Sequence, residues 1–226
     1  MNKADHSGHR DRLRTKYLEN GIESLAPHEI IEMLLYNAIP YRNTNDIAKV
    51  LLDRFGSLSG VMDAPMNELM EAGLTRNQAA FMKLIPDVTR LYLVDQHRRS
   101  DHIVTIEELP AEIVRHFIGL QDTEHVFLLL VDRKMKEVYS GILSKGTFNA
   151  SEISTRRIVN LALNHSAVGA VLAHNHPSGL ATPSREDIMA TDIISTSLRL
   201  VGVRLIDHYI VADGECVSMR DSGLLD

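Results

Sequence analysis

The chain has 226 residues, and 44% of them are apolar, which is enough for one large domain or two small ones with a real core. The formal net charge of −6 lacks the basic excess that is typical of strong nucleic-acid binders. The single cysteine, Cys216, excludes an internal disulfide and a zinc site made of several thiolates, so any metal must be bound by histidine and carboxylate.

No apolar segment reaches the length of a membrane span, and the longest one, VFLLLV, suits a buried strand. The first residues, MNKADHSGHRDRLRTKY, are polar and do not form a secretory signal. The sequence therefore predicts a cytoplasmic protein with no membrane partner.

The first half of the chain is expected to be helical. Apolar residues recur at helical spacing in PHEIIEMLLY (27–36) and in NDIAKVLLDRF (45–55), and Gly56 follows as a C-terminal cap. Two further helices are expected on either side of Gly73 in NELMEAGLTRNQAAFMKL (67–84).

The helix that follows Gly73 carries both a start signal and a break signal. Thr75 and Gln78 stand three residues apart, which is the spacing of a capping box. Pro86 has no backbone N–H, so we expect it to kink or interrupt this helix.

A polar stretch at residues 95–101 has no apolar anchor, and we place the domain boundary there, giving a helical region at 1–100 and a second domain at 101–226. The second domain should pack helices on a mainly antiparallel or mixed sheet, which makes the protein α+β. Its expected elements are a helix in 106–118, two strands in 124–148 with a turn at 133–136, a helix in 151–165, a strand in 167–176, a helix in 184–202 and two strands in 203–219.

The segment AHNHPSGLATPSRED (173–187) gathers the residue types that bind metals. Residues i and i+2 of a strand face the same side, so His174 and His176 can present two imidazoles to one point. A short loop can bring Asp187, expected in the first turn of the next helix, back to the strand end. Three nitrogen or oxygen ligands with a fourth position for water are typical of a catalytic zinc site.

The residues alone leave simpler interpretations open. A His-x-His pair can be incidental, and Asp187 can merely interact with the dipole of a helix N-terminus. Ser184 can be an ordinary capping hydroxyl, since it stands three residues before Asp187.

The full spacing is more specific than the histidine pair. Residues 174–187 resemble the JAMM (MPN+) metalloprotease motif, H-x-H-x7-S-x2-D. His174 and His176 are separated by one residue, seven residues lie between His176 and Ser184, and two lie between Ser184 and Asp187. The Pro-Ser-Gly and Thr-Pro-Ser-Arg-Glu-Asp context resembles the RadC family. The resemblance implies one Zn²⁺ per chain, held by the two histidines and the aspartate.

The resemblance extends over most of the chain, from HRDRLRTKYLENGIESLAPHEIIEMLLYNAI to VGVRLIDHYIVADGECVSMRDSGLL. It implies an N-terminal region similar to helix-hairpin-helix modules. It also implies a C-terminal α/β domain of the MPN fold (JAMM, cytidine-deaminase-like) with a mixed sheet.

The same resemblance implies two catalytic roles. Glu124, in DTEHVFLLL, matches an upstream glutamate that accepts a proton during attack and returns it to the leaving amine. Ser184 would orient the substrate carbonyl or stabilise the oxyanion, and one such donor is typically worth about 2.7 to 4 kcal/mol. A solvent-exposed charge at Glu124 is the simpler alternative. His125 and His208 lack motif support and are expected to be hydrogen-bonded structural histidines, although His208 or Asp207 could instead support a ligand.

Two segments depart from the family pattern. Ser154-Thr155-Arg156-Arg157 stands where RadC proteins have His-Pro-Arg-Glu, and only Arg156 matches, which weakens a substrate-binding role for this segment. Gly73-Leu74-Thr75 stands where helix-hairpin-helix modules have a Gly-hydrophobic-Gly turn. Loss of the second glycine restricts the close approach of the backbone to phosphate.

The sequence favours a zinc-dependent metallohydrolase, a metallopeptidase or isopeptidase, that acts on a peptide or protein substrate. Two alternatives stay open. One is a DNA-associated repair or recombination accessory protein that binds through the helical region. The other is a non-catalytic MPN scaffold, against which the complete ligand set argues.

Overall fold

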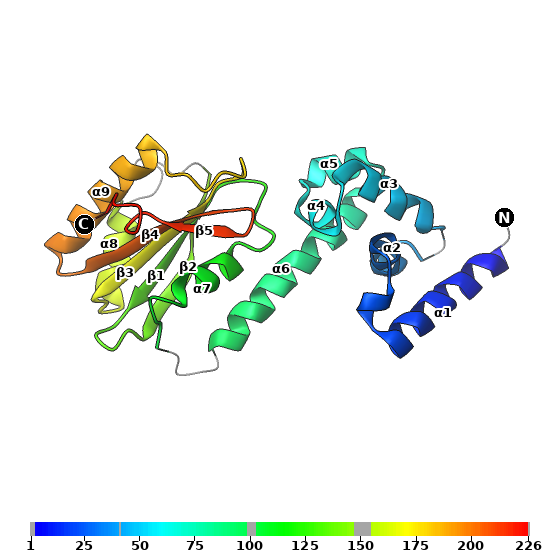
Figure 1. Ribbon diagram of the computed structural model, residues 1–226, viewed down its shortest axis with the longest axis horizontal. Helices are drawn as coiled ribbons and strands as arrows, with labels where there is room; N and C mark the ends of the chain where they lie inside the picture. Colours follow the sequence, from blue (N-terminus) through cyan, green and yellow to red (C-terminus); the bar gives the residue numbers. More distant parts are fainter. Residues whose placement is uncertain (1–2, 41, 99–102, 147–154, 226) are drawn as a thin grey trace. The chain divides into compact units, whose positions relative to one another are not determined.

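The computed structural model describes residues 3–40, 42–98, 103–146 and 155–225. The chain forms two compact units, Met1–Val88 and Thr89–Asp226, and helix α6 (Arg76–Arg98) contributes to both. The expected domain boundary between residues 100 and 101 lies outside the described residues. The predicted α+β class is confirmed, because a helical region precedes a domain with a mixed sheet (Figure 1).

The first unit is helical, as predicted. Its apolar core includes Ile31, Leu35, Leu51, Leu69 and Met82, which are fully buried. Its elements are α1 (Lys3–Asn20), η1 (Ile22–Ser24), α2 (Pro27–Ala38), α3 (Asn45–Phe55), α4 (Leu58–Asp63), α5 (Met66–Glu71) and the start of α6.

The predicted helix signals of this unit are observed, apart from the break at Pro86. Gly56 ends α3 with a φ of 78°. The Thr75 N–H donates to the Gln78 side chain over 2.8 Å, and the Gln78 N–H donates back to the Thr75 hydroxyl over 3.4 Å. Pro86 was expected to kink or interrupt the helix, and the interruption was wrong, because α6 runs through this residue. The ring removes one backbone donor, while the apolar residues that precede it, Met82 and Ile85 among them, still pack on the core.

The second unit is built on a mixed sheet with the strand order β2-β1-β3-β4-β5. Strands β3 and β4 are parallel, and the other neighbours are antiparallel. The strands are β1 (His125–Val131), β2 (Glu137–Lys145), β3 (Gly169–Asn175), β4 (Arg204–Ala212) and β5 (Glu215–Ser218). The predicted hairpin turns lie between β1 and β2 and at Asp213-Gly214.

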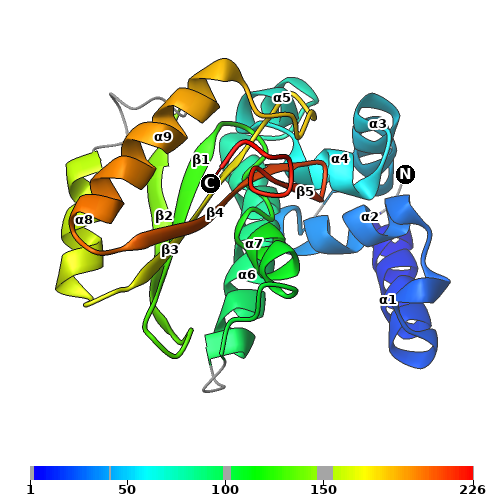
Figure 2. The ribbon, with the colours of Figure 1, turned by 60° about the vertical axis from the view of Figure 1, so that its left-hand side comes forward.

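Helices cover both faces of this sheet (Figures 1 and 2). Helices α8 (Thr155–Asn164) and α9 (Arg185–Leu200) pack on one face, and α7 (Leu109–His116) packs on the other. Val126 and Leu128 of β1 join the core under α8 and α9, while Phe127 and Leu129 join the core under α7. Strands β1 and β3 are therefore buried along their whole length, which explains why residues 126–131 and 169–173 are continuously apolar.

Among the described residues, no helix combines the length and apolar character that a membrane crossing requires.

Leu128 provides a test of the central core, because its side chain is fully buried in the middle of β1. We expect Leu128→Ala to lower the free energy of unfolding by about 2 to 5 kcal/mol, since it removes buried methyl groups and leaves a cavity. Leu200→Ala is the matched control, because Leu200 is 83% exposed, and it should change stability by less than about 0.5 kcal/mol. Urea denaturation of the full chain, followed by circular dichroism, compares the variants. Equal stability of the two would contradict this packing.

Candidate metal centre

The end of β3 positions the two histidines of the motif. His174 is within the strand and fully buried, and His176 follows it by two residues. The His176 N–H donates to the Val211 carbonyl of β4 over 2.8 Å, so strand-like pairing continues past the end of β3. The alternation of a strand is preserved, and both imidazoles lie on the α9 side of the sheet.

The loop at 177–183 turns the chain from β3 into α9. Gly179 has a φ of 79°, and a Cβ atom there would lie 2.8 Å from a carboxylate oxygen of Asp213. Only glycine fits this turn without strain, because the backbone is left-handed and the neighbouring carboxylate is close. The turn leads directly into the N-terminus of α9.

Ser184 and Asp187 form the predicted cap at the start of α9. The Ser184 N–H donates to Asp187 Oδ2 over 2.7 Å, and the Asp187 N–H donates to the Ser184 hydroxyl over 3.1 Å. These two bonds fix the rotamer of the Asp187 carboxylate. The cap uses the Ser184 oxygen only as an acceptor, so the hydroxyl hydrogen is left to donate elsewhere.

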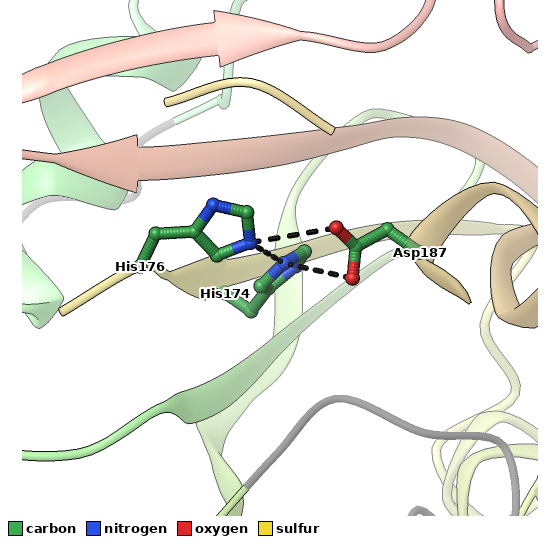
Figure 3. A group of neighbouring side chains, drawn as sticks. All are labelled: His174, His176 and Asp187. Carbon is green, nitrogen blue, oxygen red and sulfur yellow. Dashed lines mark hydrogen bonds and ion pairs between the residues drawn. The ribbon is translucent and has the colours of Figure 1, made fainter. Parts of the chain in front are cut away.

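The three predicted ligands converge in space, as Figure 3 shows. The Nε2 atoms of His174 and His176 lie 2.9 Å apart. Asp187 Oδ1 lies 3.3 Å from His174 Nε2, and Asp187 Oδ2 lies 3.4 Å from His176 Nε2. All potential ligand atoms of the group fall within 4.8 Å of one another, which is the geometry of a group that could hold a metal ion.

The outer nitrogen of His176 fixes the tautomer of this ring. Its Nδ1 lies 2.8 Å from the Leu180 carbonyl oxygen, which can only accept a hydrogen bond. Nδ1 therefore carries the proton of the neutral ring, and Nε2 keeps its lone pair. That lone pair faces His174 and Asp187.

The tautomer of His174 is set by a buried relay of three side chains. The Thr191 hydroxyl donates to the Asp187 carbonyl over 2.6 Å, so its oxygen accepts from His208 Nδ1, which also lies at 2.6 Å. A neutral His208 then has a lone pair on Nε2, and this atom lies 2.8 Å from His174 Nδ1. His174 must therefore donate from Nδ1 and direct the lone pair of Nε2 toward Asp187 and His176.

Burial and hydrogen bonding keep these groups in the form that binds a cation. Burial lowers the pKa of His174, although Asp187 opposes the shift, and burial lowers the pKa of His208 well below 6.5. Burial alone would raise the pKa of Asp187, but contacts with His174 and Ser184 hold the pKa of this carboxyl well below its usual range. Neutral imidazoles and an ionised carboxylate are the protonation states that metal binding requires.

Glu124 stands immediately before β1 and is half-buried. Val126 pairs with His174 across the antiparallel ladder, so these two side chains lie on one face. By strand alternation Glu124 lies on that face as well, and its charge is among the influences that raise the pKa of His174. Glu124 is thus on the same side of the sheet as the candidate ligands.

The remaining residues named from the sequence fall in different places. His125 is buried and its Nδ1 lies 2.9 Å from the Thr123 carbonyl, so it is a hydrogen-bonded structural histidine, as predicted. His208 is also buried and hydrogen-bonded, and its partner is a candidate ligand. Ser154 lies outside the described residues. Arg157 donates to the Leu143 carbonyl over 2.6 Å.

The sequence analysis did not identify Thr191 as part of the site. Thr191 follows Asp187 by four residues and therefore shares its face of α9, which is a signal that could have found it.

Comparison with protein-family models identifies the family of the second domain. Residues 104–224 match the model of the RadC-like JAB domain. The matched range contains Glu124, Ser184 and the three residues of the cluster.

Curated relatives match along nearly the whole chain. A UPF0758 protein of Fusobacterium nucleatum is 32% identical over 232 residues, which cover 100% of both proteins. A UPF0758 protein of Pseudomonas syringae pv. tomato is 34% identical over 95% of this chain and 96% of its own length. A UPF0758 protein of Aeromonas salmonicida is 32% identical over the same shares of the two chains.

The relay predicts that His208 governs the affinity of the cluster for zinc. His208→Phe keeps a ring of similar size but leaves the His174 N–H without an acceptor, so we expect the affinity to fall by about 10-fold to 100-fold. Competition with a chromophoric chelator measures the affinity in metal-depleted protein. His165→Phe is the matched control, because His165 is exposed and lies against Tyr139 instead. Equal zinc affinity in the two variants would refute the relay.

The buried neutral histidines also predict acid sensitivity of the metal-free protein. Their pKa values are lower in the folded chain than the ordinary 6.5, so the unfolded chain binds more protons below that pH. The free energy of unfolding should therefore fall as the pH drops below 6.5, with a slope of up to about 1.4 kcal/mol per pH unit for each histidine. Urea denaturation in the presence of a chelator, over a series of pH values, measures the slope. His208→Phe should reduce the slope, and an unchanged slope would contradict the assignment.

Proposed function

Because this chain belongs to the RadC family, through a JAB domain at residues 104–224, we propose that it is a zinc-dependent hydrolase of the JAMM type that cleaves a peptide or isopeptide bond. His174, His176 and Asp187 hold the zinc ion. Glu124 moves the proton, and Ser184 contacts the substrate carbonyl.

One observation carries the proposal. Two imidazole lone pairs and a carboxylate converge, and hydrogen bonds to Leu180 and His208 determine that both lone pairs face inward. Such a group is repulsive unless a cation or a proton is shared within it. The hydrogen bonds at the outer nitrogens require buried polar groups, which an apolar core would not need. These bonds therefore support a site organised around a cation.

The donor set fits zinc. Two histidine nitrogens and one carboxylate oxygen leave a fourth tetrahedral position, which is the pattern of catalytic rather than structural zinc sites. When bound, zinc supplies Lewis acidity, which polarises a carbonyl oxygen and makes a water molecule acidic near neutral pH. The side chain of His176 is 13% exposed while that of His174 is fully buried, so access to the cluster is from the His176 side.

Each remaining residue has a role that its contacts allow. Glu124 is half-buried on the ligand face, where its carboxylate can take a proton from water and return it to a leaving amine. Ser184 already accepts a hydrogen bond from Asp187, so its hydroxyl hydrogen can be donated to a developing oxyanion. An amide substrate uses both roles, because cleavage needs protonation of the amine as well as stabilisation of the oxyanion.

Binding of the helical region to DNA stays a prediction. Residues 1–88 contain ten lysines and arginines against twelve aspartates and glutamates, so this unit offers no basic excess that would attract phosphate. The α5–α6 turn carries Thr75 where a second glycine would allow close approach, and its N–H is already used in the cap.

The proposal predicts a separation between metal binding and catalysis. Wild-type protein and Glu124→Gln should each contain one zinc ion per chain by mass spectrometry, whereas His176→Ala should contain none. Cleavage of peptide and isopeptide substrates should be lost in His176→Ala and fall by about 100-fold or more in Glu124→Gln. Glu215→Gln is the matched control, because Glu215 is exposed on β5.

Two results would overturn the proposal. Wild-type protein that takes up no zinc, even when the ion is added, would remove the metal site. Cleavage that survives both His176→Ala and Glu124→Gln would show that another group performs the reaction.

A further inference from the structure

Asn175 lies between the two candidate histidine ligands, but strand alternation directs its side chain to the opposite, α7-facing side of β3. It is fully buried. Its Oδ1 accepts the His125 N–H over 2.7 Å, and its Nδ2 donates to the carbonyls of Leu120 and Thr123 over 2.7 Å and 3.0 Å. All three contacts fall on the segment that leads from α7 into β1.

These bonds fix the orientation of the amide group. A backbone N–H can only donate and a carbonyl can only accept, so the oxygen must face His125 and the NH₂ group must face Leu120 and Thr123. Aspartate would place an anionic oxygen against two carbonyl oxygens. Leucine would leave the His125 N–H and the Leu120 carbonyl without these partners and would leave the Thr123 carbonyl only its contact with His125 Nδ1. Asparagine is therefore the residue of this size that satisfies the three backbone groups together.

The clamped segment contains the peptide group that joins Glu124 to His125. Its carbonyl accepts the Gly146 N–H from the β2 side over 2.8 Å, and its N–H donates to Asn175 on the β3 side. This one peptide group is thus held at both edges in the plane of the sheet. The side chain of Asn175 replaces a backbone partner and extends the sheet beyond the Val126–His174 pair.

Holding this peptide group fixes the direction in which the Glu124 side chain leaves the backbone. The strand that supplies two candidate ligands therefore also supplies the anchor of the candidate proton acceptor. We propose that Asn175 is a positioning residue, which clamps the Glu124 peptide to β3 and so sets the place of the Glu124 carboxylate relative to His174 and His176. This inference rests on the proposed function for its catalytic consequence, but the clamp itself can be tested without it.

The test compares Asn175→Leu with wild type in the full chain. Hydrogen exchange, read by mass spectrometry on peptides that cover residues 117–126, should become faster by about tenfold at the His125 amide, which loses its acceptor. Zinc content should stay at the wild-type value, since Asn175 is not a ligand. Once a cleaved substrate is in hand, kcat should fall by about 10-fold to 100-fold with KM unchanged, because the proton acceptor is displaced while the binding groups remain.

Two further variants guard against a general loss of structure. Asn175→Ser leaves room for water to replace part of the amide, so it should fold and show a smaller change of the same kind. Ser218→Ala is the matched control, because the Ser218 hydroxyl donates to the buried Asp207 carboxylate within the β4–β5 pair. It should leave both the exchange of that segment and kcat unchanged.

The outcomes separate this inference from the proposed function. Unchanged exchange at residues 117–126 in both Asn175 variants would overturn the clamp, whatever the metal content. Faster exchange with an undiminished kcat would overturn the positioning role. If wild-type protein binds no zinc, the proposed function fails, and the exchange measurement still decides whether Asn175 holds the Glu124 peptide.

Discussion

The crossover between β3 and β4 is the constraint on which the candidate site depends. Parallel neighbouring strands require the chain to return over the sheet, and α9 makes that return (Figure 1). The helix must then begin at the end of the sheet where β3 stops. This geometry brings a first-turn carboxylate, Asp187, to the two histidines at the strand end, and the Ser184 cap holds it in place. The topology thus brings Asp187 close to the histidines, and the cap fixes the direction of its carboxylate.

Consecutive residues at the end of β3 direct their side chains to opposite faces of the sheet. His174 and His176 point toward α9, where Asp187 and the His208–Thr191 relay lie. Asn175 points toward α7 and binds the backbone before β1. One buried strand therefore organises both a group of candidate ligands and the segment that carries a candidate base. A register shift of one residue would exchange the two sets, so the pairing of β3 with both neighbours determines which side chains face α9 and which face α7.

Much of this arrangement could be predicted because the determining signals are local. Alternation placed the histidines on one side, capping spacing placed Ser184 before α9, and apolar runs marked β1 and β3 as buried. The predicted interruption at Pro86 was wrong, because the loss of one backbone donor does not end α6 there. The ligand and catalytic roles stay predictions, since a shared position on one face of the sheet does not establish turnover.

The partners of the ligands could not be predicted, because they are distant in sequence. His174 and His208 are 34 residues apart, and Asn175 and His125 are 50 residues apart. Such contacts depend on the order of strands in the sheet, which hydrophobic periodicity does not specify. From the sequence, His208 could be a structural histidine or a residue that supports a ligand, and the structure is compatible with both. It is a buried, hydrogen-bonded histidine, and it also determines the tautomer of a candidate ligand.

The relay also explains why a neutral, buried network suits this position. A charged partner on the outer nitrogen of His174 would need a second charge to offset its desolvation. Here His174 donates to the neutral His208, and His208 donates to the Thr191 hydroxyl. The hydroxyl donates to the backbone carbonyl of Asp187, so every donor has an acceptor and no charge is added. The net negative charge of the cluster then comes from Asp187 alone. A divalent cation bound there would therefore meet one anionic oxygen and two neutral nitrogens from these three residues.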